Sequence, residues 1–221
     1  MQTASTDFDL TGQVVWQAAD IFAKFLLSGN QGHDLLQGKR VLELGSGPGL
    51  GGFVASKWAS EVVLSDYQDI VLDLMESNIA SYNHNAHTCP MFCSKIDWYE
   101  ILKDDYFDQI ELVDEEGNVA GRLRDRQLDV VIGTDVIYWR HTIEPLIDTL
   151  EVLSQANPNL KIYICYIERH LITHKQLKEN LASRGFKLTE FGQDITKPIN
   201  EHSYMYEISR QAAADDGEAA V

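Results

Sequence analysis

Cysteines, basic residues and long apolar runs are scarce in this chain of 221 residues, and each scarcity excludes a class of protein. The three cysteines are too few and too irregularly spaced for a disulfide framework, which favours a reducing compartment. No apolar run approaches the roughly 18 residues that a membrane-spanning helix needs, and residues 1–10 lack the basic-then-apolar pattern of a signal peptide. We therefore expect a cytoplasmic protein without a membrane partner, with the nucleus as the alternative compartment.

Basic residues are outnumbered, because 18 lysines and arginines face 34 aspartates and glutamates, for a net charge of −16. A surface this acidic repels a phosphate backbone, so we expect no nucleic acid partner. It attracts basic peptides and proteins. On composition alone, acidity that only keeps the protein soluble is the better explanation.

The length suits one α/β domain with a sizeable core, and the chain shows no internal repeat and no linker. We place this domain at residues 11–210, between a mobile N-terminus (1–10) and a disordered acidic tail (211–221), and expect a monomer. Short apolar runs predict strands, and they alternate with amphipathic runs that predict helices. The strands are expected at residues 41–44, 61–66, 89–93, 130–132, 161–167, 186–191 and 203–208, and the helices at 14–27, 50–58, 70–79, 143–153 and 171–183.

A glycine-rich loop after the first strand is the most informative stretch of the sequence. Gly45, Gly47 and Gly49 alternate there, and glycine lets the backbone turn sharply and approach a ligand closely. A dinucleotide site would need a glycine where Leu50 stands, so the register does not fit a nicotinamide cofactor. The frame that fits is E-x-G-x-G-x-G from Glu43, which places a carboxylate in the strand end facing the ligand. The alternative is a loop that only closes a tight turn.

Polar residues at the carboxyl ends of three further strands extend this candidate crevice, since ligands of open α/β sheets bind at that edge. Asp66 lies about 20 residues past the loop, the spacing expected for an acid that binds a ribose, or it caps the next helix. Asp97 can accept the exocyclic amine of an adenine and Trp98 offers a stacking face, unless Trp98 packs in the core. Asp135 and Tyr138 follow the fourth strand and should face the same crevice, unless they are a helix cap and a packed aromatic.

Two histidines and two cysteines lie close enough in sequence to raise the question of a zinc site. His84, His87, Cys89 and Cys93 match none of the common ligand spacings, and both cysteines fall where we expect the third strand. We therefore expect no bound metal.

Acidic residues crowd the stretch 102–127, in which a turn signal at 116–118 separates two short apolar runs. The pattern predicts a hairpin inserted at the rim of the sheet. It either helps to recruit a basic substrate or is only a solvated insertion.

Three features together carry a family resemblance: the E-x-G-x-G-x-G loop, the D-x-x-Y sequence from Asp135 to Tyr138, and Trp16 in the first predicted helix. Residues 12–210 resemble methyltransferase family 16, which contains many protein-lysine methyltransferases dependent on S-adenosylmethionine (SAM). The resemblance implies a Rossmann-like class I SAM-dependent methyltransferase fold of the α/β class. Its seven-stranded, mostly parallel sheet would have the order 3-2-1-4-5-7-6, a reversed last strand and helices on both faces. The chain departs from the family at Thr134, where alanine or glycine is common, and a larger residue there could narrow the methyl channel.

For function, the resemblance implies methyl transfer from SAM to a protein side chain, with lysine as the first expectation. Asp135 and Tyr138 would border the substrate side chain as catalytic residues. A methyltransferase for small molecules or for protein histidine or arginine, and a non-catalytic SAM-binding module, are the alternatives. The cofactor-binding residues would be Trp16, Glu43, Gly45, Ser46, Gly47, Gly49, Asp66, Asp97, Trp98 and Thr134.

A lysine acceptor poses a chemical problem, because its amine must lose a proton before it can react and its ordinary pKa is about 10.4. Tyr138 could hold the amine through its ring face or its hydroxyl, and Asp135 could orient it. A carboxylate raises the pKa of a lysine whereas desolvation lowers it, and the sequence leaves that balance open.

Overall fold

The computed structural model describes residues 8–83 and 89–210. Of the predicted mobile N-terminus, only residues 8–10 are described, and they begin a 3-10 helix, η1 (Phe8–Gln13). The predicted acidic tail lies outside the described residues, as do His84 and His87 of the zinc hypothesis.

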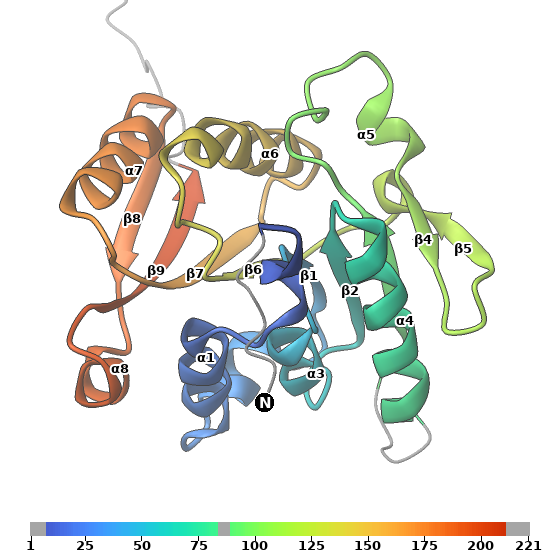
Figure 1. Cartoon of the computed structure of the whole chain (residues 1–221), viewed down its shortest axis with the longest axis horizontal. Helices are drawn as coiled ribbons and strands as arrows, with labels where there is room; N and C mark the ends of the chain where they lie inside the picture. Colours follow the sequence, from blue (N-terminus) through green and yellow to red (C-terminus); the bar gives the residue numbers. More distant parts are fainter. Residues whose placement is uncertain (1–7, 84–88, 211–221) are drawn as a thin grey trace, which may run out of the picture.

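One mixed sheet of nine strands forms the centre of the fold, in the order β5-β4-β3-β2-β1-β6-β7-β9-β8 (Figure 1). From β3 to β8 this order is the predicted 3-2-1-4-5-7-6, and the reversed last strand is confirmed, because β9 runs antiparallel to both β7 and β8. The strands are β1 (Arg40–Leu44), β2 (Glu61–Asp66), β3 (Met91–Lys95), β4 (Glu111–Val113), β5 (Val119–Arg122), β6 (Val130–Thr134), β7 (Lys161–Ile167), β8 (Phe186–Glu190) and β9 (Ser203–Arg210).

The predicted count of seven strands is wrong, because the acidic hairpin, which lies at the edge of the sheet as predicted, adds two strands to it. β4 pairs antiparallel with β3 through Val113 and Cys93, and β5 pairs with β4. Leu112 and Leu123 of this insertion are buried in the same core cluster as the central strands. These apolar side chains anchor an otherwise acidic segment to the sheet.

Helices cover both faces of the sheet, as predicted, because the central strands are apolar on both sides. Leu42 belongs to a core cluster with Leu146 of α6, whereas its neighbour Val41 belongs to a second cluster with Phe22 of α1. In Figure 1, α6 and α7 accordingly lie across the sheet from α1 and α3. The helices are α1 (Gln17–Leu27), α2 (Gln31–Leu36), α3 (Leu50–Ala55), α4 (Asp69–Asn83), α5 (Tyr106–Gln109), α6 (Ile143–Ala156), α7 (Leu171–Ser183) and α8 (Gln193–Ile199), with 3-10 turns η2 (Leu123–Asp125) and η3 (Arg140–Thr142).

Several predicted boundaries need correction. The first helix begins at Gln17 instead of residue 14, so Trp16 is the capping residue before it. The helix expected at 50–58 ends at Ala55, and the third strand is shifted towards the C-terminus. Three short helices, α2, α5 and α8, were not predicted, and α8 contains Pro198. No described helix combines the length and apolar character that crossing a membrane requires.

Candidate active site

A cavity of about 510 Å³ opens at the carboxyl ends of β1, β2 and β6, within the usual size range of ligand pockets. Six parts of the chain line it: the segment around the start of α1, the loop after β1, the end of β2, the residues after β3, the loop after β6 and the loop after β7. Of the twelve predicted site residues, ten line this cavity: Trp16, Gly45, Ser46, Gly47, Asp66, Asp97, Trp98, Thr134, Asp135 and Tyr138.

The loop after β1 needs its glycines for two different reasons. Gly45, Gly47 and Gly49 all have positive φ, at 58°, 52° and 91°, a region that strains other residues. A Cβ on Gly45 would also stand 3.0 Å from Val136 and 3.5 Å from Trp98, where it would fill part of the cavity. Gly49 lies away from the cavity, and its Cβ would press on a core side chain instead.

Glu43 is the second predicted residue that does not line the cavity, and the expectation that its carboxylate faces the ligand is wrong. The side chain is fully buried beneath the loop, where the backbone N–H of Gly52 in α3 donates to its Oε2 at 2.9 Å. Burial raises the pKa of Glu43 to about 8, against the opposing effect of the Gly52 N–H. Glu43 therefore holds the first turn of α3 against β1.

Asp66 lies at the end of β2, is almost buried and lines the cavity. Its Oδ1 accepts the backbone N–H of Tyr67 at 2.8 Å, and its Oδ2 accepts that of Gly47 at 3.3 Å. Burial raises its pKa, and these N–H donors oppose the shift. The acid thus ties the glycine loop to β2 while remaining at the cavity wall.

Asp97 and Trp98 stand together after β3, at the side of the cavity next to the hairpin. The Oδ1 of Asp97 accepts a hydrogen bond from the backbone N–H of Tyr99 at 2.9 Å. The backbone N–H of Asp97 donates to the hydroxyl oxygen of Tyr106 at 2.8 Å. Both Asp97 and Trp98 line the cavity. Trp98 is partly buried and packs against the core while it also lines the cavity, so core packing does not exclude the predicted ligand contact.

Asp135 begins the loop after β6 in a left-handed conformation, with φ of 59°. Its backbone N–H donates to the carbonyl of Cys165 in β7 at 2.7 Å. Its carboxylate receives two hydrogen bonds from Arg169, at 2.9 and 2.6 Å. The D-x-x-Y acid is therefore a member of a bidentate ion pair.

Arg169 also lines the cavity, although it was not among the predicted site residues. It lies two residues beyond the end of β7, at the sheet edge where the other site residues gather. This position in the sequence is the one feature from which a role in the site could have been predicted. Its guanidinium also lies over the ring of Trp16, 5.4 Å from the centroid. Three segments of the chain meet at this one side chain.

Tyr138 stands at the mouth of the cavity, 38% exposed, with its ring edge against Trp139. Burial raises the pKa of its phenol, and the nearby Tyr67 and Asp66 act in the same direction. Trp16, Tyr67, Tyr99 and Trp139 are exposed large side chains that line the same cavity. The mouth is therefore a ring of aromatic residues.

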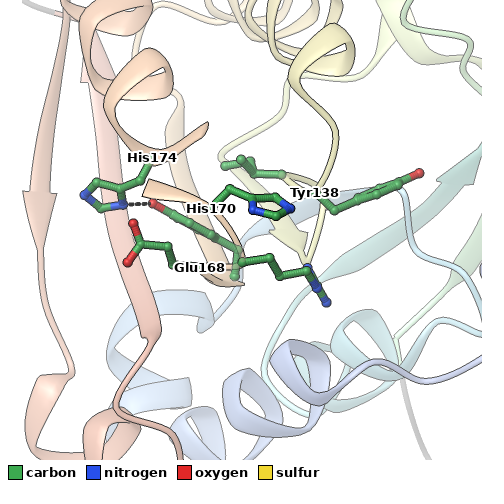
Figure 2. A pocket seen from close by; sticks show the side chains of 7 residues that line it. Tyr138, Glu168, His170 and His174 are labelled. Atoms are coloured by element: carbon green, nitrogen blue, oxygen red, sulfur yellow. Dashed lines mark hydrogen bonds between the residues drawn. The ribbon is translucent and has the colours of Figure 1, made fainter. Parts of the chain in front are cut away.

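A smaller pocket adjoins the mouth between Tyr138 and the segment that runs from β7 into α7 (Figure 2). Figure 2 shows His170 beside Tyr138, while His174 points to the far side, where its Nδ1 lies 2.5 Å from the hydroxyl of Tyr166. This tight packing supports the loop that carries Arg169.

The zinc hypothesis finds no support in the described part of the chain. Cys89 and Cys93 are free thiols, and no group of three metal-ligating side chains occurs among the residues that the structure describes.

The strand order and the position of the cavity define a class I SAM-dependent methyltransferase fold. The crystal structure of magnesium protoporphyrin IX methyltransferase from Synechocystis PCC 6803 with bound SAM matches it with a TM-score of 0.52 at 14% sequence identity, covering 96% of this chain and 86% of that chain. A family profile described as lysine methyltransferase matches residues 3–114 and 116–182, so the chain belongs to that family. The resemblance drawn from the motifs is confirmed.

Curated relatives of the chain are named for different acceptor side chains. The protein-lysine N-methyltransferase EFM3 of Chaetomium thermophilum is 32% identical over 183 residues, which is 81% of this chain and 49% of the relative. The histone-arginine methyltransferase METTL23 of Mus musculus is 26% identical over 160 residues, 70% of this chain and 53% of the relative. The chain spans about half the length of these curated relatives.

Proposed function

We propose that this chain transfers a methyl group from SAM to the side chain of a protein lysine. The observation that carries the proposal is that the glycine loop and the D-x-x-Y sequence, far apart along the chain, line one cavity with an aromatic mouth. The family to which the chain belongs supports the same reaction.

The residues of the inner cavity fit SAM. The absence of a Cβ at Gly45 leaves space between Val136 and Trp98, and the carboxylate of Asp66 is at the wall where a ribose could donate to it. Bound there, SAM would supply a methyl group on a sulfonium that is already activated for displacement. We assign to it the predicted residues that line the cavity, Trp16, Gly45, Ser46, Gly47, Asp66, Asp97, Trp98 and Thr134, and give Glu43 and Gly49 the role of supporting the loop.

The protein's own task is to align an unprotonated amine and to keep water from it. An acceptor amine that enters between these aromatic side chains loses part of its water, and desolvation favours the neutral form of a lysine amine. Tyr138, at the rim, is the residue best placed to hold the acceptor side chain, and Asp135 with Arg169 forms the floor beside it.

Arginine is the second candidate acceptor, because a relative of similar coverage is named as a histone-arginine methyltransferase. A guanidinium keeps its charge at all ordinary pH values, so it demands an acid that accepts its N–H groups. The carboxylate best placed for that role, Asp135, already receives Arg169 of this chain. This favours lysine.

The finer expectations about the protein in the cell belong to the same proposal. We infer a monomer of the cytoplasm, or of the nucleus, that acts on a basic protein and does not bind nucleic acid. The net charge of −16 and the acidic hairpin of β4 and β5 support a basic partner.

The test is incubation with radiolabelled SAM and a whole-cell protein extract, followed by separation on a gel and hydrolysis of labelled bands. We expect a discrete band that contains methyl-lysine with the wild type and at most a trace with Asp135→Ala. Asp73→Ala, which removes an exposed carboxylate of α4 away from the cavity, is the matched control and should label like the wild type.

Other outcomes decide between the alternatives. Methyl-arginine in the hydrolysate would show that the acceptor side chain is arginine and not lysine. SAM binding in a calorimeter without any labelled protein would point to a small-molecule acceptor or a binding role, and absence of SAM binding would overturn the proposal.

A further inference from the structure

Arg169 is the one lysine or arginine among the described residues that line the cavity. It donates from Nη1 and Nη2 to the two oxygens of Asp135, at 2.9 and 2.6 Å. The side chain of Asp135 is 3% exposed and that of Arg169 is 35% exposed. A bidentate pair this well shielded is held together much more strongly than a surface ion pair.

The surrounding backbone fixes the acid for this pair. The left-handed φ of Asp135 and the hydrogen bond from its N–H to the Cys165 carbonyl set the direction of the side chain. The backbone N–H of Ile167 lies 3.5 Å from the carboxylate and adds a third donor. Trp16 covers the guanidinium from the other side, at 5.4 Å. An acceptor amine that enters the cavity therefore meets a neutral pair instead of a bare acid.

The other ionisable groups around the mouth make this neutralisation important. They come from the ends of β2, β3, β6 and β7, and the two further carboxylates among them carry negative charge towards the cavity. These groups are Asp66 and Tyr67 after β2, Asp97 and Tyr99 after β3, Tyr138 and His141 after β6, His170 after β7, and Cys165 within β7 behind Asp135. Without Arg169, three acids would share the cavity with no permanent cation.

We propose that Arg169 is a positioning residue for methyl transfer, which neutralises Asp135 and so prevents the acceptor amine from being held as an ammonium ion. This rests on the proposed lysine methyltransferase function. In the step that it favours, the lone pair of the neutral nitrogen forms the bond to the methyl carbon while the sulfur–carbon bond breaks with its electron pair left on sulfur. The product nitrogen then releases its proton to solvent through the open mouth.

Replacing Arg169 by glutamine removes the charge and leaves a shorter side chain that can still form hydrogen bonds. The carboxylate of Asp135 then stabilises an ammonium ion, and an opposite charge at this range moves a pKa by about one unit or more. Below that pKa, the neutral fraction of the acceptor falls about tenfold, so the pH at which activity is half-maximal should rise by about one unit.

The experiment uses the whole chain, saturating radiolabelled SAM and the same whole-cell extract, with methyl-lysine counted after hydrolysis from about pH 7 to about pH 10.5, a range that spans the lysine pKa. Four proteins are compared: wild type, Arg169→Gln, Arg169→Lys and the double variant Asp135→Asn with Arg169→Gln. Calorimetry with SAM and thermal denaturation show whether each variant binds the cofactor and is folded.

We expect the pH at which activity is half-maximal to rise in Arg169→Gln and to stay nearer the wild-type value in Arg169→Lys, which keeps the charge. We also expect the double variant, in which both charges are gone, to be more active than Arg169→Gln at about pH 7. An unchanged half-maximal pH, a double variant no better than Arg169→Gln, or a glutamine variant faster than wild type would overturn it. The last result would mean that Arg169 blocks the acceptor position. If the wild type produced no methyl-lysine, the proposed function would fail and this proposal with it.

Discussion

Two buried acids, one beneath the glycine-loop half of the cavity wall and one within the other half, are stabilised in different ways. Glu43 receives one backbone N–H, from Gly52, and among the described residues its Oε1 has no hydrogen-bond partner. With its pKa raised to about 8, it is mostly protonated at neutral pH. Asp135 receives one N–H from each of Nη1 and Nη2 of Arg169 and is paired as a carboxylate. The half of the cavity wall around Glu43 is thus stabilised by packing, and the half around Asp135 by an ion pair.

The difference predicts how each half fails. The half around Glu43 fixes the shape of the glycine loop, because α3 lies directly on the acid and leaves no space for a side chain at Gly51 or Gly52. The half around Asp135 fixes the charge at the mouth, where Arg169 is 35% exposed and Trp16 is 43% exposed. Changes in the first should unfold the protein, and changes in the second should stop the reaction.

The largest effect is expected from Gly52→Ala, which tests the packed half. The new Cβ would overlap Leu64 and stand 3.1 Å from Oε2 of Glu43, and overpacking a core costs about 3 kcal/mol at its upper range. We expect the free energy of unfolding, measured by urea denaturation, to fall by about that amount.

Gly117→Ala is the matched control for this prediction. Gly117 has a positive φ of 79° but no atom near the position of a Cβ, so only backbone strain of about 1 kcal/mol is at stake. Equal losses of unfolding free energy in the two variants would show that the loop tolerates a side chain over Glu43 and that close packing of α3 on this acid does not stabilise the protein.

Asp135→Ala should have the next largest effect, on the reaction instead of on folding. Alanine leaves Arg169 without its partner and cannot hold the left-handed backbone as easily as aspartate. Since a small misplacement near the reacting atoms costs about 100-fold in rate, we expect a loss of that size in label incorporation. SAM binding, measured by calorimetry, should remain close to that of wild type.

Asp135→Asn is the companion variant, because asparagine tolerates the left-handed conformation and can still accept from Arg169. The asparagine variant should lose less activity than the alanine variant. If both were equally inactive, the negative charge of Asp135 would itself be required for the reaction, and its neutralisation by Arg169 could not be the reason for the pair.

A smaller effect is expected in the pH dependence of stability, to which Glu43 contributes through its raised pKa. A folded-state pKa of about 8 means that Glu43 binds its proton more tightly in the folded than in the unfolded chain, where the ordinary value is 4.5. Stability from this group is therefore present below about pH 4.5 and is lost as the pH rises towards 8. We expect the wild type to lose about 2 kcal/mol from about pH 5 to about pH 8, within the limit of about 1.4 kcal/mol per pH unit.

Glu43→Gln should flatten this slope, because the amide cannot ionise. A residual decline in the same direction is expected from Asp66, whose pKa is also raised by burial. Urea denaturation of both proteins across the pH range is the measurement. Parallel slopes for the two proteins would mean that Glu43 is not the group responsible.

Much of this fold follows from local patterns. The apolar runs at β1, β2, β6 and β7 are strands because each is buried on both faces, and the helical period of α1 and α6 is plain in the sequence. The glycine loop and the acids at strand ends could be assigned to one crevice because parallel strands end at one edge. Ten of the twelve predicted residues indeed line one cavity.

What could not be predicted depends on contacts between distant segments. Whether Glu43 faces the ligand or α3 is decided by the close approach of Gly51 and Gly52, which no spacing rule contains. Arg169 belongs to the site through Asp135 and Trp16, from two other segments, and a lone arginine after a strand has no signature of its own. The hairpin joined the sheet because of two buried leucines within an acidic stretch.

The smallest effect is expected at Tyr138, where the charged half meets solvent. Its ring lies against Trp139 with centroids 5.9 Å apart, and burial raises the pKa of its phenol, so the hydroxyl stays protonated over the ordinary pH range. If the ring face is what holds the acceptor, Tyr138→Phe should reduce label incorporation by threefold or less, roughly, and Tyr138→Ala by about tenfold. The half-maximal pH should be the same in both variants as in wild type, in contrast to Arg169→Gln. A phenylalanine variant as slow as the alanine variant would assign the holding of the amine to the hydroxyl, and a shifted pH profile would make Tyr138, beside the Asp135–Arg169 pair, a second group that sets the protonation of the acceptor.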